Sequence, residues 1–477
     1  MRAAIRLTIC LLLLGNLLPA QVEPLYFMRT NNARLQYNPG LPAYRKCRFM
    51  VGTGGLDFGA ALGYFSYNDL IVKGEDGYKY LNTVQLAENF KSESSKVRAD
   101  GRVELFDLGI SLGKTYADLS LQLRSETALR LPGEALAYLM EGNAGYVGVP
   151  VRSEISVSGI DYLEAGFTLQ HTFDKKYTFG IRPKMLFGLA YAQTTSGSLL
   201  LHTDNDWNLH VGGGMEGLLF YPDPDGMSGP DGKFQTKRLR PLLTGNSGFA
   251  VDLGADVALN KHVGLSVSLL DAGAIRWEVQ EPYRKKRLVA GLNPESPFYV
   301  DGELVFKGLD EEKIRQLLDG ENPFEEIADS IGSWFVWQFE EDSPSSFRTR
   351  LTPKLLAEVR YSFTPKHSLS ALLRYDFLPE KGIPTVTLGY SGSVLPFLDL
   401  AATYTLWDLN MRKNLLGAGI QIHAGAFNLM LSAYQFEADF KHRRLAWRNM
   451  RQAGIQFGCY FSFGQRGVTK KKKEEDS

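Results

Sequence analysis

After residue 20 the sequence lacks any continuously apolar stretch of about 18 residues, so no later segment predicts a transmembrane helix. The formal net charge is zero, which gives no support to nucleic-acid binding, and we expect no nucleic-acid partner. The three cysteines have neither metal-site spacing nor the density of a disulfide scaffold. A role in a membrane would therefore depend on strands.

Catalytic motifs are also missing. The seven histidines are scattered without a HExxH arrangement, and the segment Gly389 to Ser393 departs from GxSxG at its last position. The segment Asp223 to Gly226 lacks the carboxylate spacing of a calcium loop. We therefore expect no catalytic residues, no metal and no cofactor, and we predict that the protein is not an enzyme.

The N-terminus predicts export. Basic Arg2 and Arg6 precede an apolar run from Leu7 to Leu18, and Ala20 offers a small residue for cleavage. The run is shorter than the roughly 20 residues of a membrane-spanning helix. Cys10 lies at the front of this run, which argues against lipid attachment. We predict a signal peptide over residues 1–20.

Period-two alternation dominates the rest of the chain. Near the C-terminus, apolar residues from Ala453 to Phe463 alternate with polar or small ones, as expected of a strand with two unlike faces. Similar segments recur upstream, including separate ones at 177–191 and 197–203. The high content of glycine, tyrosine and phenylalanine fits a membrane barrel. We predict an all-β fold, a transmembrane antiparallel β-barrel of about 16 strands, with 14 as the alternative count.

The connections alternate in length, as in bacterial barrels with short periplasmic turns and long outer loops. Short turns are predicted at 113–114, 174–176, 203–206, 260–261, 364–366, 391–396 and 425. A soluble β-sandwich is the main competitor, but aromatic residues near strand ends, such as Tyr361, Phe363 and Phe397, are typical of membrane interfaces. The predicted organisation is a signal peptide (1–20), an N-terminal periplasmic segment (21–45), the barrel (46–464) and a charged periplasmic tail (465–477).

Charged residues fall out of phase with the apolar face and are expected to line the lumen. Their mixed signs favour internal ion pairs, with a solute or ion path as the alternative. Counting from the turn at 364–366 places Glu358 near Leu372 and predicts an ion pair between Glu358 and Arg374. The candidate lumen residues are Asp118, Arg124, Glu164, Arg182, Lys184, Asp252, Asp256, Glu358, Arg360, Arg374, Asp376 and Asp399.

Two outer loops have helical periodicity. The loop over residues 310–335 is expected to pack over the barrel mouth as a lid, or alternatively to dock a partner. In the other loop, a short helix is predicted at 133–141. The residues of the possible lid are Ile314, Leu317, Phe324, Ile327, Ile331 and Phe335.

Cys47 and Cys459 lie in the first and last predicted strands, which become neighbours when a barrel closes. Direct opposition would bring them within disulfide range, although two apolar lipid-facing thiols are the simpler interpretation.

Several stretches resemble a Bacteroidota-type outer-membrane barrel family of unknown function. It is similar in style to fatty-acid-transporter-like barrels and to barrel partners of type IX secretion. The stretches are Phe106 to Gly113, Gly159 to Leu201, Leu351 to Leu355 and Gly417 to Gly419. They are strand and turn patterns, so the resemblance implies the fold and transfers little about function.

We predict a porin-like, integral protein of the outer membrane of a Gram-negative bacterium, surrounded by outer-membrane lipid. The favoured function is gated passage of a small apolar or amphiphilic solute whose identity the sequence does not give. The alternative is a non-transporting scaffold for a periplasmic or surface protein partner, and an outer-membrane enzyme is the weakest reading.

Overall fold

The computed structural model describes residues 24–44, 48–61, 66, 71–74, 77–91, 96–223, 245–280, 282–306, 334–343, 345–378, 382–406, 414–437 and 452–464. The predicted signal peptide and the charged tail lie outside these ranges. Within them, no helix is both long enough and apolar enough to cross a membrane.

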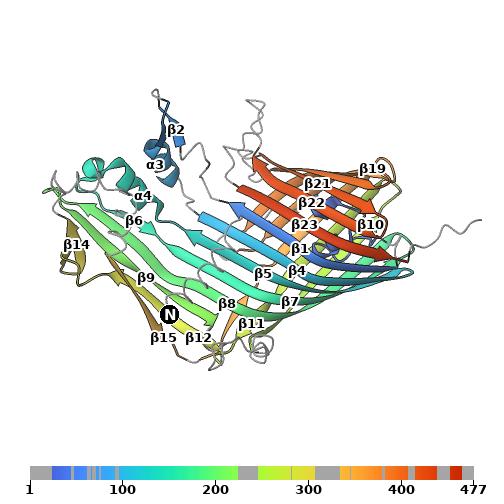
Figure 1. Cartoon of the computed structure of the whole chain (residues 1–477), viewed down its shortest axis with the longest axis horizontal. Coiled ribbons are helices and arrows are strands. Elements are labelled where there is room, and N and C mark those ends of the chain that lie inside the picture. The colour runs from blue at the N-terminus through green and yellow to red at the C-terminus, as the bar shows by residue number, and fades with distance from the viewer. Residues whose placement is uncertain are drawn as a thin grey trace, which may run out of the picture.

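An antiparallel barrel of 14 strands closes where the last strand pairs with the first (Figure 1). Phe49 lies opposite Phe463 and Ala61 opposite Gln452 across this seam. In order around the wall, the strands are β1 (Phe49–Ala61), β4 (Lys96–Leu112), β5 (Thr115–Arg130), β7 (Ser156–Phe173), β8 (Tyr177–Thr203), β10 (Ser247–Ala258), β11 (Val263–Trp277), β17 (Lys354–Ser362), β18 (His367–Asp376), β19 (Ile383–Leu395), β20 (Leu398–Leu406), β21 (Asn414–Ala424), β22 (Phe427–Glu437) and β23 (Gln452–Phe463).

The closed wall has the alternative count of fourteen, not sixteen, because β8 is one strand of 27 residues and the strand that follows it lies outside the closed wall. The segments expected separately at 177–191 and 197–203 are both part of it. Its first half pairs with β10 in the barrel wall, and its second half continues beyond the barrel and pairs with β9 (Leu209–Pro222). The turn at 203–206 therefore lies at the opposite end from the other short turns.

We call the end of the barrel with the remaining short turns the turn end, and the opposite end the loop end. At the loop end the sheet extends to one side, as Figure 1 shows around β9, β12 and β15. The additional elements are β2 (Ile71–Lys73), β3 (Lys79–Leu81), α3 (Thr83–Lys91), α4 (Gly133–Glu141), η3 (Asn143–Tyr146), β6 (Val151–Glu154), β12 (Tyr283–Leu292), β13 (Tyr299–Val300), β14 (Glu303–Phe306), β15 (Phe335–Glu341) and β16 (Phe347–Arg350). The helix predicted at 133–141 is confirmed as α4.

The two faces of the wall have opposite polarity. In β18, buried Ser368, Ser370 and Arg374 alternate with exposed Leu369 and Leu373. Period-two alternation produces this pattern because successive side chains of a strand point to opposite faces. Similar exposed apolar side chains on other strands are Leu119, Phe167, Ile181, Phe249, Leu253, Val267, Val359, Leu388, Ile420, Leu431 and Ile455.

The N-terminal segment, residues 24–44, lies inside the barrel. It contains two short 3-10 helices, η1 (Pro24–Phe27) and η2 (Asn32–Gln36). Its apolar side chains, among them Leu25 and Leu41, pack against inward-facing Leu372 and Met430. We expected residues 21–45 to lie in the periplasm, whereas the described part of this segment lies in the lumen.

Lumenal side chains hold the backbone of the N-terminal segment. The Gln170 carboxamide accepts a hydrogen bond from the backbone N–H of Ala43 at 3.0 Å and donates to the carbonyl oxygens of Pro39 and Leu41. Ser268 donates to the carbonyl oxygen of Tyr37 at 3.0 Å. Buried backbone groups must find such partners, so the lumen positions the segment as well as enclosing it.

Glycines in the wall make room for this contact. A Cβ atom added at Gly180 would overlap the carbonyl group of Pro39, and one at Gly254 would overlap Gly40 and the Asn38 side chain. The backbone of the segment therefore approaches the wall more closely than any side chain would allow.

We predict that Gly180→Ala displaces the N-terminal segment, because the new methyl group occupies the space of the Pro39 carbonyl. Limited proteolysis should then cut within residues 24–44, while heat-dependent gel mobility still shows a folded barrel. Gly101→Ala is the control, since its nearest neighbour would be the Ser125 Cβ at 3.9 Å. Equal protease resistance of the two variants would contradict the prediction.

Candidate functional site

All twelve charged residues proposed for the lumen lie on the inner face of the wall. Ten of them are buried, and Arg124 and Arg360 are largely buried. The structure divides them into a large ionic network, three smaller groups and the separate Asp118.

The ionic network is centred on Glu164 and Lys184. Glu164 accepts from Arg124 and Arg182, each at 3.2 Å. Lys184 lies 2.7 Å from Asp252 and 2.5 Å from Asp271. These contacts join β5, β7, β8, β10 and β11, so the network ties five consecutive wall strands together.

The network is balanced in charge. Lys354 joins it by pairing with Asp271 at 2.9 Å and Glu126 at 3.4 Å. Its bases are Arg124, Arg182, Lys184 and Lys354, and its acids are Glu126, Glu164, Asp252 and Asp271. Four charges of each sign make such a buried network sustainable, because an unpaired charge away from water is costly.

The predicted ion pair between Glu358 and Arg374 is replaced by other contacts. The register places Glu358 opposite Leu372, as expected. However, Glu358 accepts hydrogen bonds from Tyr26 of the N-terminal segment at 3.2 Å and from Ser266 at 3.0 Å. Arg374 instead binds Asp376, two residues along the same strand face, at 2.7 Å. No sequence pattern indicated that Tyr26 would reach this position.

The remaining candidate residues lie in separate contacts. Arg360 bridges Asp256 at 2.9 Å and Glu358 at 3.5 Å. Asp399 binds His423 at 2.9 Å and accepts from Thr30 of the N-terminal segment.

Glu104 and Asp107 are two lumenal acids that the sequence pattern did not identify. Their odd spacing would place them on opposite faces of a regular strand. The register between β4 and β5 shifts between Glu104 and Phe106, which is a β-bulge. The extra residue, Leu105, is exposed and turns both acids inward. A bulge has no dependable sequence signal, so alternation alone could not place them.

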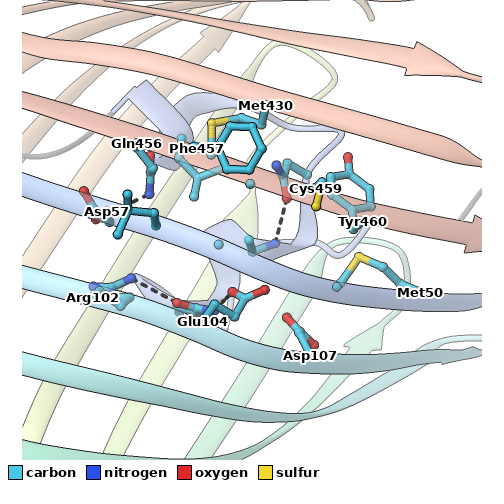
Figure 2. Close-up of a pocket in the computed structure, with 18 residues that line it drawn as sticks. Met50, Asp57, Arg102, Glu104, Asp107, Met430, Gln456, Phe457, Cys459 and Tyr460 are labelled. Carbon is cyan, nitrogen blue, oxygen red and sulfur yellow. Dashed lines mark hydrogen bonds between the residues drawn. The ribbon is translucent and has the colours of Figure 1, made fainter.

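A pocket with about 510 Å³ of empty space, part of it open to solvent, lies beside these acids, between the N-terminal segment and the wall. Figure 2 shows Arg102, Glu104 and Asp107 on one side of β1, and Met430, Gln456 and Phe457 on the other. We call it the acidic cavity. Its wall is irregular, because the pairing of β1 with β23 also shifts between Thr53 and Leu56.

A second pocket, with about 310 Å³ of empty space that is partly open to solvent, continues toward the turn end. We call it the rim cavity, since Arg48, Phe49 and Ser462 at the ends of β1 and β23 line it. Met50 and Tyr460 line both cavities and are buried. These two side chains therefore lie at the junction between them.

The predicted lid is mostly outside the described residues. Ile314, Leu317, Phe324, Ile327 and Ile331 fall there, and Phe335 is the first residue of β15, where it pairs with Leu292.

The register does not give the direct opposition of Cys47 and Cys459 on which the predicted disulfide depended. Cys459 lies opposite Thr53 of β1. Cys47 lies outside the described residues.

A model of a family of unknown function, DUF5723, matches residues 39–433. The chain belongs to this family. No curated protein matches the sequence. Among solved structures, the DUF5723 chain is similar to the Ralstonia pickettii toluene transporter TbuX, with 9% identity, 93% of this chain and 98% of the other covered, and a TM-score of 0.47. The Pseudomonas putida toluene transporter TodX has 10% identity, coverages of 94% and 99%, and a TM-score of 0.43. A Pseudomonas aeruginosa FadL homologue has 10% identity, coverages of 94% and 100%, and a TM-score of 0.39.

In this DUF5723 barrel we predict that Lys184→Met lowers the free energy of unfolding by about 3–5 kcal/mol, because it leaves Asp252 and Asp271 without their closest shared cation. Urea unfolding in detergent measures the change. Arg276→Met, which breaks an exposed pair with Glu278, is the control and should cost less than about 1 kcal/mol. The ionic network has no structural importance if the two variants unfold alike.

Proposed function

We propose that this protein is an integral outer-membrane barrel that passes a small apolar or amphiphilic solute, with the N-terminal segment as its gate. The observation that carries the proposal is the pair of adjoining cavities inside the wall, which meet at Met50 and Tyr460.

A membrane location is supported by the outer face of the wall. Its exposed side chains are apolar on strand after strand, which is the polarity that lipid requires. Exposed aromatic side chains gather at the turn end, as in the aromatic girdle at a membrane interface. They are Phe49, Phe173, Tyr177, Phe179, Tyr361, Phe363, Phe397, Phe427, Phe461 and Phe463.

Passage is supported by the order of the cavities along β1. The acidic cavity lies within the barrel, and the rim cavity reaches the ends of β1 and β23 at the turn end. Among the described lining residues, only Met50 and Tyr460 are shared between the two cavities, and both are buried. Methionine is flexible and adopts alternative shapes readily, so this junction suits a constriction that opens and closes.

Gating by the N-terminal segment is supported by its position along both cavities. Leu25 and Gln36 line the acidic cavity, and Thr30 and Tyr44 line the rim cavity. A shift of this one segment would change the width of both cavities together.

We predict that an epitope inserted at Asp206 is accessible to antibody on intact cells, and that one at Lys175 is accessible only after the outer membrane is permeabilised. The short turns of bacterial barrels face the periplasm, and the structure places these residues at opposite ends. The reverse labelling pattern would contradict the proposed orientation.

We predict that Met50→Ala increases flux severalfold and Met50→Trp decreases it, because the side chain at this position separates the cavities. Conductance in planar bilayers and osmotic swelling of proteoliposomes in hexyl glucoside measure the effect. Met185→Ala is the matched control, since Met185 is an exposed residue on the outer face of the wall. Unchanged flux in both Met50 variants would refute the route.

A further inference from the structure

The acidic cavity carries an excess of negative charge. Among the described residues that line it, the acids are Asp57, Glu104 and Asp107, and the only base is Arg102. This differs from the ionic network, in which four acids face four bases.

Two of the acidic groups converge on one point of the wall. A Cβ atom placed on Gly52 would lie 3.0 Å from Oε1 of Glu104 and 3.2 Å from Cβ of Asp107. The third acid, Asp57, already has hydrogen-bond donors. Its carboxylate accepts hydrogen bonds from Tyr434 at 2.5 Å, Tyr37 at 3.3 Å and Gln456 at 3.4 Å. Glu104 and Asp107 therefore form the polar end of the cavity.

One buried acceptor at this polar end has no partner among the described residues. Asp107 is 3% exposed, and its Oδ1 atom has no hydrogen-bond partner among the described residues. The Glu104 carboxylate accepts one hydrogen bond, from the Gln36 side chain to its Oε2 atom at 3.0 Å. A buried carboxylate without a partner is costly, so such a cluster gains most from a cationic donor.

The two nearest arginines are engaged elsewhere. Arg102 donates to Gln36 of the N-terminal segment at 2.9 Å and lies over the Tyr37 ring. Arg182 donates to Ser120 at 2.8 Å and pairs with Glu164 in the balanced network.

The donor set suits an organic ammonium group better than a metal ion. Within the described part of the chain, no three His, Cys, Asp or Glu side chains come together as possible metal ligands. Calcium and magnesium need roughly six or more oxygen ligands. An ammonium group has three N–H donors, which two or three acceptors can satisfy.

Part of the remaining cavity lining is apolar and adaptable. Leu25, Met50, Met430 and Phe457 line it together with the acids. Methionine side chains fill irregular gaps and accept ligands of different shape. A hydrocarbon chain can occupy this part while its head group binds the acids.

We propose that the acidic cavity binds a small amphiphilic cation, a primary alkylamine, with its ammonium group at Glu104 and Asp107 and its hydrocarbon chain against the methionines. This inference rests on the proposed function, since it names the chemical class of the solute. It excludes a fatty acid as the preferred ligand, because a carboxylate head group would face like charges.

The test is calorimetric binding to the purified full-length protein in a non-ionic detergent. The probes are hexylammonium, 1-hexanol and hexanoate, which share a six-carbon chain and differ in head group. We expect hexylammonium to bind at least about tenfold more tightly than the other two, since charge-assisted hydrogen bonds are the stronger ones. Equal affinities, or a preference for hexanoate, would overturn the proposal.

Two isosteric variants locate the site. Asp107→Asn and Glu104→Gln should each weaken hexylammonium binding about tenfold and leave hexanol binding unchanged, because each removes a charge and keeps the shape. Asp206→Asn, in the exposed turn between β8 and β9, is the matched control. Heat-dependent gel mobility reports folding, and Glu104→Gln, at a less buried position, carries the test if Asp107→Asn does not fold. Full affinity in a folded variant would place the amine elsewhere and overturn the assignment.

The outcome is separable from that of the proposed function. Head-group-selective binding without flux in bilayers would remove passage and leave this site standing. Flux through the barrel without preference for hexylammonium would leave passage and overturn the site.

Discussion

The pairing of β1 with β23 is the constraint on which the other features depend. Once these strands join, each alternating strand has one face toward an enclosed interior, and that face carries the charged residues. Those charges then lose most of their contact with bulk water, so they must be neutralised within the barrel. The ionic network achieves this around Glu164 and Lys184. Closure of the barrel therefore requires the charged residues of the inner face to pair with one another.

The N-terminal segment inside the barrel must also find partners for its buried polar groups. Its backbone groups are buried in the lumen and bind side chains of the wall, notably Gln170 and Ser268. In return Tyr26 donates to Glu358, which shifts that acid away from the pairing expected from the strand register alone. The segment is therefore part of the hydrogen-bonding system of the barrel. This is why its displacement is expected to alter both cavities rather than simply to unblock them.

The fold was largely predictable from the sequence, because period two is a direct consequence of strand geometry. The alternation identified the inner and outer faces, and turn counting placed Glu358 opposite Leu372. The strand count required knowledge of where β8 leaves the barrel, and no residue pattern marks that point. The partner of Glu358 is Tyr26, which lies 332 residues away in sequence. Contacts between distant segments are set by packing, which local patterns do not contain.

The candidate site was the least predictable part because it depends on shifts in the register of strand pairing. A shift in the pairing of β4 with β5 brings Glu104 and Asp107 to one face, and a nearby shift in β1 lies along the same cavity. Bulges are frequent next to functional sites because they redirect single side chains without changing the fold. A regular wall would have sent one of these acids outward, to the apolar face, where a charge is least tolerated. The irregular pairing is therefore what allows Glu104 and Asp107 to share one cavity, and it is the physical reason why this cavity carries an excess of negative charge.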